Sequence, residues 1–440
     1  MADTMAPKKQ RNYVIELFKV FWALLVVIAH VVAQLTFPLG LPPTTEATFA
    51  TNPGLEYSFF YAVYGEVLGI SGYLTIGIFC FLSGYGLVNE FKKNQRRGVV
   101  GKGKDVAIIG KLAVRNWSSY VPYFTFGVGF SFILYHVIFP AFRDFKVIVA
   151  HFVTSFFQFV GIYGFGEANV YKGAQFSAGL TENHTVNVIS TLFEWNGPLW
   201  YMFALTIFGV VIYALLVANE KLTVFVIGPV IFSIYTLVGQ SATVLANIGT
   251  YGIYNKGLII CGMLFLGVWG WYITDWLKKQ EFSHKGKIGL SVLLVFFVGL
   301  LVYNFVFYYA GMNYTDMVAT FVFIIVLAEK DYITVGLNKF LNKLPFMKYA
   351  STLSLGLYCT HFPVMCVFRV MKDIGGEFTA VNDWFFGHNV DQITLIIIGL
   401  TFVACIPFFV YDKFVAKKFI AWFQKATKVN EPVIINEEVK

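Results

Sequence analysis

Long apolar runs alternate with short polar segments along the chain. An α-helix that crosses a bilayer needs about 20 consecutive, predominantly apolar residues. We therefore predict an all-α fold, a polytopic membrane helix bundle of about ten transmembrane helices. The apolar runs that predict these helices lie at 13–36, 68–89, 117–140, 198–218, 223–240, 256–276, 288–309, 316–329, 349–371 and 393–415.

A further apolar run at 147–166 is ambiguous because it contains polar side chains, the first of them His151. It either spans the membrane or lies at its interface. Loop charges help here, because short cytoplasmic loops carry an excess of Lys and Arg. If 147–166 does not span, the basic loops all lie on the side of the amino terminus. We therefore predict that both termini are cytoplasmic and that 141–197 is an outside loop.

Composition supports this prediction. Of the 440 residues, 57% are hydrophobic and 13% are charged, and the mean hydropathy is +0.66. A soluble domain carries about 25% charged residues. The net charge of +8 could suggest a nucleic-acid partner, but the basic residues lie in short loops between apolar runs. We therefore expect the lipid bilayer, and no nucleic acid, as a partner.

We predict that the chain divides into a cytoplasmic amino-terminal segment 1–12, a transmembrane domain 13–416 and a cytoplasmic tail 417–440. The tail is too short to fold alone. We expect neither a disulfide framework nor a metal site, because the cysteines lie inside apolar stretches without paired spacing. These cysteines are Cys80, Cys261, Cys359, Cys366 and Cys405.

The first run places ionisable residues on one helix face. His30 follows Lys19 by eleven positions, which is about three turns with about 20° of residual rotation. Glu16 lies one turn before Lys19 and can pair with it. Lys19 could instead snorkel to the headgroups, and His30 could simply bond a neighbouring helix. A buried imidazole without a carboxylate nearby is expected to be neutral, which suits a general base.

Three more polar or aromatic residues in the runs are candidate substrate-binding residues: Ser83, Trp200 and His361. Each also has a structural explanation. Ser83 precedes Gly84, and small residues favour close helix packing. Trp200, with its neighbour Tyr201, fits an aromatic belt at the outer membrane interface. A lone His361 can form a hydrogen bond between helices.

Five stretches, in order, resemble the acyltransferase-3 family of membrane acyltransferases. "RNYVIELFKVFWALLVVIAH" is similar to its first helix, with the Arg/Lys-ten-residues-His pattern met by Lys19 and His30. "IFCFLSGYGL" is similar to its second-helix signature. The later stretches are "VRNWSSYVPYF", "NGPLWYMFAL" and "ASTLSLGLYCTHFPV", and the resemblance covers about 11–415.

The resemblance implies a function. Family members move acyl groups, usually acetyl from cytoplasmic acetyl-CoA, onto hydroxyls of cell-surface or extracellular glycans. The family histidine maps to His30 and its basic partner to Lys19, with Glu16 bracing it. Arg115 matches one of the family's arginines at the start of the third span, but Ser118 occupies the position of another. Candidates for the missing cation, and for binding acyl-CoA, are Lys111, Arg96 and Arg97.

We expect no carboxy-terminal esterase-like domain of the kind that many peptidoglycan-modifying members carry. This favours members that modify capsule, exopolysaccharide or lipid-linked sugars, in a bacterial plasma membrane. A secondary transporter or flippase is the alternative, since a polar stripe across ten spans would also serve it. The absence of an inverted repeat and of matching broken helices speaks against a transporter.

Overall fold

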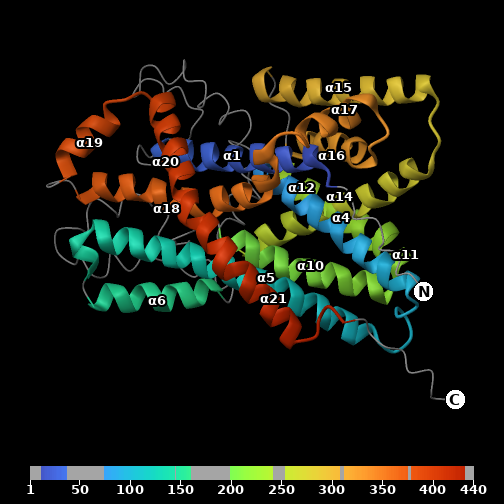
Figure 1. Ribbon diagram of the computed structural model, residues 1–440, viewed down its shortest axis with the longest axis horizontal. Coiled ribbons are helices and arrows are strands. Elements are labelled where there is room, and N and C mark those ends of the chain that lie inside the picture. The colour runs from blue at the N-terminus through green and yellow to red at the C-terminus, as the bar shows by residue number, and fades with distance from the viewer. Residues whose placement is uncertain are drawn as a thin grey trace.

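The computed structural model shows a bundle of helices (Figure 1). It describes residues 11–36, 74–143, 145–159, 199–240, 253–307, 312–374 and 378–431, and these ranges contain no strand. The predicted all-α class is therefore confirmed for the described part of the chain. The predicted outside loop 141–197 lies mostly outside the described residues.

The described residues form fifteen α-helices and four shorter turns of 3₁₀ or π helix. The α-helices are α1 (Tyr13–Thr36), α4 (Leu74–Arg96), α5 (Asp105–Ile138), α6 (Phe145–Phe159), α10 (Trp200–Ala218), α11 (Glu220–Leu222), α12 (Gly228–Gln240), α14 (Ile253–Lys279), α15 (His284–Phe307), α16 (Met312–Ala328), α17 (Tyr332–Leu341), α18 (Ala350–Ile374), α19 (Thr379–Phe386), α20 (Val390–Tyr411) and α21 (Lys417–Ala426). Short 3₁₀ turns occur at η3 (Pro140–Arg143) and η7 (Pro345–Tyr349), and π-helical turns at η5 (Thr223–Ile227) and η9 (Asp412–Ala416).

Each of the ten predicted apolar runs overlaps a helix of the described chain. Six helical segments there are long and apolar enough to cross a membrane. The count of ten spans and the side of the termini stay predictions. The six segments are Asp105–Ile138, Tyr201–Ala218, Ile260–Lys279, His284–Tyr303, Pro345–Phe368 and Asp391–Ala426.

The ambiguous run forms helix α6, whose described part has 15 residues. A helix of that length rises only about 22 Å, less than the roughly 30 Å of a bilayer core. Figure 1 shows α6 beside the second half of α5, to which it returns after the η3 turn. The remainder of the run lies outside the described residues.

Glycines allow α4 and α14 to approach at backbone distance. A Cβ atom added at Gly84 would lie 2.0 Å from the carbonyl oxygen of Leu264, and one added at Gly267 would lie 2.0 Å from that of Phe81. No side chain larger than hydrogen fits at either position without separating the helices. The packing role predicted for Gly84 is therefore confirmed.

The predicted cytoplasmic segments contact one another at one end of the bundle. Arg11 donates to the carbonyl of Lys348, and Asn12 donates to Glu329. The predicted tail takes part too, because Lys111 on α5 donates to the carbonyl of Glu431. The helix α21 continues from α20 through η9 and packs along α5. The basic loops thus gather on one side, as a common side of the membrane requires.

Candidate active site

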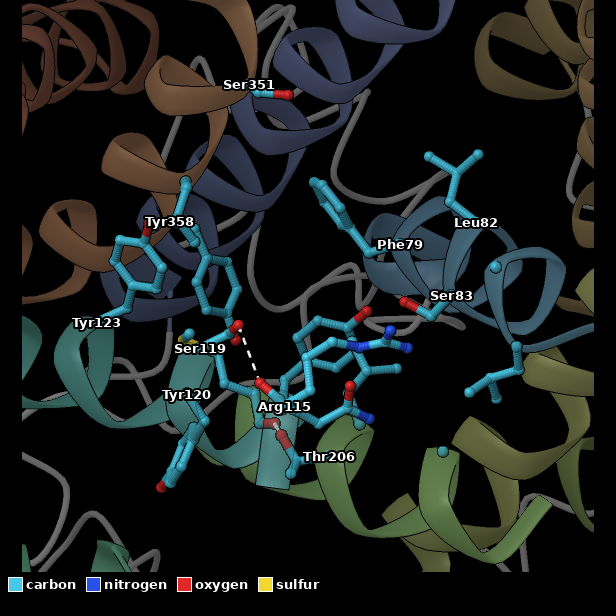
Figure 2. Close-up of a pocket in the computed structure, with 18 of the residues that line it drawn as sticks. Phe79, Leu82, Ser83, Arg115, Ser119, Tyr120, Tyr123, Thr206, Ser351 and Tyr358 are labelled. Atoms are coloured by element: carbon cyan, nitrogen blue, oxygen red, sulfur yellow. Dashed lines mark hydrogen bonds between the residues drawn. The ribbon is translucent and has the colours of Figure 1, made fainter. Parts of the chain in front are cut away.

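A cavity of about 640 Å³ lies between α1, α4, α5, α10 and α18 (Figure 2). Its volume falls within the range of about 300–1,000 Å³ that is typical of small-molecule sites. Most of its wall is apolar or aromatic, with a few polar groups and two cations. The lining residues are Lys19, Phe79, Leu82, Ser83, Gly86, Leu87, Leu112, Arg115, Asn116, Ser119, Tyr120, Tyr123, Tyr201, Met202, Leu205, Thr206, Gly209, Ser351, Ser354, Leu355 and Tyr358.

Lys19 reaches the cavity from α1 and is held there by Glu16. The Lys19 Nζ lies 3.3 Å from Glu16 Oε1, one helical turn away. Glu16 is itself buried, and its other oxygen accepts a hydrogen bond from Ser351 on α18 and forms an ion pair with Arg11 at 3.3 Å. The predicted Glu16–Lys19 pair therefore forms, and the hydrogen bond from Ser351 to Glu16 connects the start of α1 to the start of α18.

Arg115 reaches the cavity from α5. Its Nη1 lies 3.4 Å from Glu90 Oε1, so the guanidinium extends towards α4 (Figure 2). The Ser118 and Ser119 hydroxyls donate to the Arg115 carbonyl at 2.7 and 3.2 Å. The Arg115 guanidinium has more donors than one carboxylate can use, so it retains donors for an anionic ligand.

Two histidines lie next to this cavity without lining it. His361 Nε2 on α18 is 3.1 Å from His30 Nδ1 on α1. The ring centroids are 5.0 Å apart, and Phe362 packs edge-on against His30 at 5.8 Å. Tyr358, which lines the cavity, precedes His361 by one turn of α18 and its ring centroid is 6.2 Å away. The cavity therefore ends about one helical turn from the histidine pair.

A family comparison agrees with this architecture. The model of a family described as an acyltransferase domain matches residues 12–412. The chain belongs to the acyltransferase-3 family. No curated protein and no solved structure matches the chain. The family resemblance seen in the five sequence stretches is thus confirmed, and acyl transfer by a multi-pass membrane protein is the coarse function that membership indicates.

The structure brings together some predicted site residues of this acyltransferase. Lys19, Ser83 and Arg115 share the cavity wall. His30 and His361, which the sequence could not connect, contact each other. Trp200 begins α10, and its side chain lies outside the described residues.

The other predicted cations do not line the cavity. Lys111 donates to the carbonyl of Glu431 at 2.8 Å instead, and Arg96 and Arg97 lie where α4 ends. Ser118, which replaces a family arginine, is buried and accepts a hydrogen bond from Gln424 of α21 at 3.0 Å. The end of the described chain therefore occupies the space beside α5 where a second arginine is typical.

Several tyrosines of the cavity wall were not predicted. Tyr201 is only 5% exposed and accepts from Cys80 at 3.7 Å, so an aromatic belt at the membrane surface does not explain it. Tyr123 donates to the buried carboxylate of Asp412 at 2.9 Å. Tyrosine in an apolar run is the only signal that could have identified them, and such residues are common in membrane helices.

Among the described residues, no three His, Cys, Asp or Glu side chains are grouped as a metal site. All five cysteines lie in the described part of the chain, and none of them forms a disulfide there.

Proposed function

We propose that this protein is an integral membrane O-acyltransferase. It transfers an acyl group, in the simplest case acetyl, from cytoplasmic acyl-CoA to a hydroxyl of a cell-surface, exopolysaccharide or lipid-linked glycan. The observation that carries the proposal is the cavity that holds two cations and ends one helical turn from a histidine pair inside the bundle. We place the protein in a bacterial plasma membrane.

The cations suit the donor. Coenzyme A carries phosphates, and guanidinium and ammonium groups are the side chains that bind phosphates best. Arg115 and Lys19 stand near the starts of α5 and α1, on the side where the basic loops gather. A donor bound there would have its phosphates at the cations. Its uncharged pantetheine arm would lie along the aromatic wall towards Tyr201 and Tyr358.

The histidine suits the chemistry. His30 lies about 16 Å along α1 from Lys19, on the same face. In the proposed reaction, His30 removes the proton of the acceptor hydroxyl, and the oxygen attacks the thioester carbonyl. The carbon–sulfur bond breaks, and the leaving thiolate takes the proton from the imidazolium. The products are an ester and free coenzyme A, so no other reactant is needed.

A transporter or flippase is the alternative. A helix bundle with polar groups inside would serve it too. In a transporter, the Glu16 carboxylate and the Arg115–Glu90 ion pair would line the path of a transported substrate instead of binding acyl-CoA. The two proposals differ in whether a covalent bond is broken.

The decisive experiment uses purified protein in lipid nanodiscs with [¹⁴C]acetyl-CoA and a panel of glycan acceptors. We expect release of coenzyme A thiol, with label appearing on the acceptor as an alkali-labile ester. Nanodiscs prepared without the protein are the control. The acyltransferase proposal would be contradicted if neither thiol release nor a labelled acceptor were observed. If the protein also accelerated exchange of a sugar across the membrane of proteoliposomes, the transporter would be supported.

A further inference from the structure

The contact between His30 and His361 determines where protons lie in the pair. His361 Nδ1 is 2.9 Å from the carbonyl oxygen of Leu357, one turn earlier on α18. A carbonyl can only accept, so His361 carries its proton on Nδ1. In the neutral ring the other nitrogen, Nε2, then has a free lone pair. That nitrogen is the one that faces His30.

The same reasoning applies to His30. Its Nδ1 is 3.0 Å from the carbonyl oxygen of Val26 and 3.1 Å from His361 Nε2. Both neighbours are acceptors, so Nδ1 of His30 carries a proton that the two share. The neutral His30 ring therefore has its lone pair on Nε2. Within the described part of the chain, no hydrogen bond engages that nitrogen.

We propose that His361 is a positioning residue for His30, rather than the substrate-binding residue that the sequence suggested. By accepting from Nδ1–H, it orients the His30 ring and leaves Nε2 as the base that takes the acceptor's proton. When His30 becomes an imidazolium, its Nδ1–H bond to His361 becomes charge-assisted and roughly twice as strong. This inference rests on the proposed acyl transfer.

The packing of both helices supports this role. His361 is fully buried on α18, and the elements α1 and α18 pack along each other. Phe362 contacts both rings, and Tyr358 lies between His361 and the cavity. His361 is therefore enclosed by Phe362, Tyr358 and His30, so its own ring is held in place and can orient the ring of His30.

The kinetic test compares two substitutions. His361→Phe keeps a flat ring but removes the acceptor. His361→Gln places an amide oxygen close to the position of Nε2. We expect His361→Phe to lower kcat about 10–100-fold, the usual cost of losing an orienting partner, with KM for acetyl-CoA and for the glycan unchanged. We expect His361→Gln to recover most of the lost rate.

Two other outcomes would overturn the inference. A raised KM for the glycan with an intact kcat would make His361 a substrate-binding residue. Equal losses of kcat in both variants, with equal losses of thermal stability, would leave it a helix-packing residue only.

A second measurement does not need turnover. In protein labelled with ¹⁵N-histidine, we expect His30 to be protonated on Nδ1 and not on Nε2, with a scalar coupling across the hydrogen bond to His361 Nε2. His30→Gln and His361→Gln spectra assign the two signals. A His30 protonated on Nε2 instead would overturn the inference even if the protein transfers acetyl groups. Absence of thiol release by wild-type protein with the expected tautomer would overturn only the proposed function.

Discussion

The described part of the bundle contains two histidine pairs whose nitrogen–nitrogen distances are nearly equal. His30 and His361 meet at 3.1 Å, and His136 and His151 meet at 3.2 Å. In both pairs the Nε2 of one ring faces the Nδ1 of the other, and a backbone carbonyl holds the accepting ring by its Nδ1. Distance and hydrogen bonding therefore do not distinguish the pair that we propose to serve the reaction from a structural pair.

The surroundings do distinguish them. His136 and His151 lie 15 positions apart, at the point where α5 turns through η3 into α6. His136 Nδ1 donates to the carbonyl of Phe142 within that turn, and the Phe132 ring packs against both histidines. This pair joins two consecutive helices and stabilises the turn between them.

The pair formed by His30 and His361 joins helices from opposite ends of the chain, 331 positions apart. It also lies one turn from a cavity with two cations. The comparison teaches that the neighbourhood of a buried histidine, not its partner, indicates function. The following predictions test that difference.

The largest effect is expected from the same substitution made in each pair. His30→Ala should lower kcat about 10²–10⁴-fold, since it removes the proposed general base. His136→Ala should leave kcat close to that of the wild type, because it only loosens the turn. Coenzyme A thiol release by nanodisc-embedded protein measures both. Similar losses in the two variants would remove the distinction between the pairs.

An arginine lies near each site and permits a second comparison. Arg115 lines the cavity, whereas Arg143 donates to the His136 carbonyl at 3.0 Å. Arg115→Ala should weaken acetyl-CoA binding about 10–100-fold, since a charged hydrogen bond contributes about 1.5–3 kcal/mol. Arg143→Ala should not change it. Calorimetric titration with coenzyme A tests this, and unchanged binding by correctly inserted Arg115→Ala would exclude it from the site.

The role of Lys19 is tested by comparing a substitution that removes its positive charge with one that keeps it. We propose that it helps to hold the donor's charged portion, so Lys19→Ala should raise KM for acetyl-CoA about tenfold. Lys19→Arg should be tolerated, because it preserves the ion pair with Glu16. Initial rates at varied acetyl-CoA give both values. A large fall in kcat with an unchanged KM would instead connect Lys19 to proton transfer.

The smallest effect is expected at His151. His151→Phe keeps an aromatic ring against Phe132 but removes the hydrogen bond to His136. The free energy of unfolding should fall by about 1 kcal/mol, the typical value of one hydrogen bond. Thermal denaturation in detergent measures it, and thiol release should be unaffected. A strong loss of activity in a stable variant would show that the second pair also serves the reaction.

Helical periodicity was sufficient to predict the geometry of the first helix. Glu16, Lys19 and His30 share a face of α1 because a helix repeats every 3.6 residues, and the Glu16–Lys19 ion pair forms as expected. The apolar runs predicted where helices occur, because a lipid-exposed backbone must satisfy its own hydrogen bonds. The predicted second-helix packing at Gly84 follows from the small size of that residue.

The neighbours across helices could not be predicted in this way. The sequence offered four cations in and between α4 and α5 as candidates for binding acyl-CoA: Arg96, Arg97, Lys111 and Arg115. Of these four, only Arg115 lines the cavity, and Lys111 instead donates a hydrogen bond to the carbonyl of Glu431. Tyr201 fits an interfacial belt by its position in the run but is buried against Cys80. Which side chain faces a cavity depends on how helices distant in sequence are rotated and packed.

The sequence by itself determined the membrane-protein class, the family and the stripe of polar residues on the first helix, since these depend on composition, motif order and local periodicity. Only the tertiary structure determined where the cavity lies, that Arg115 is the predicted arginine which lines it, and that His30 contacts His361. These features arise from packing between α1, α4, α5, α10 and α18. A contact across 331 positions leaves no periodic pattern, because no local interaction encodes the rotation of one helix against another.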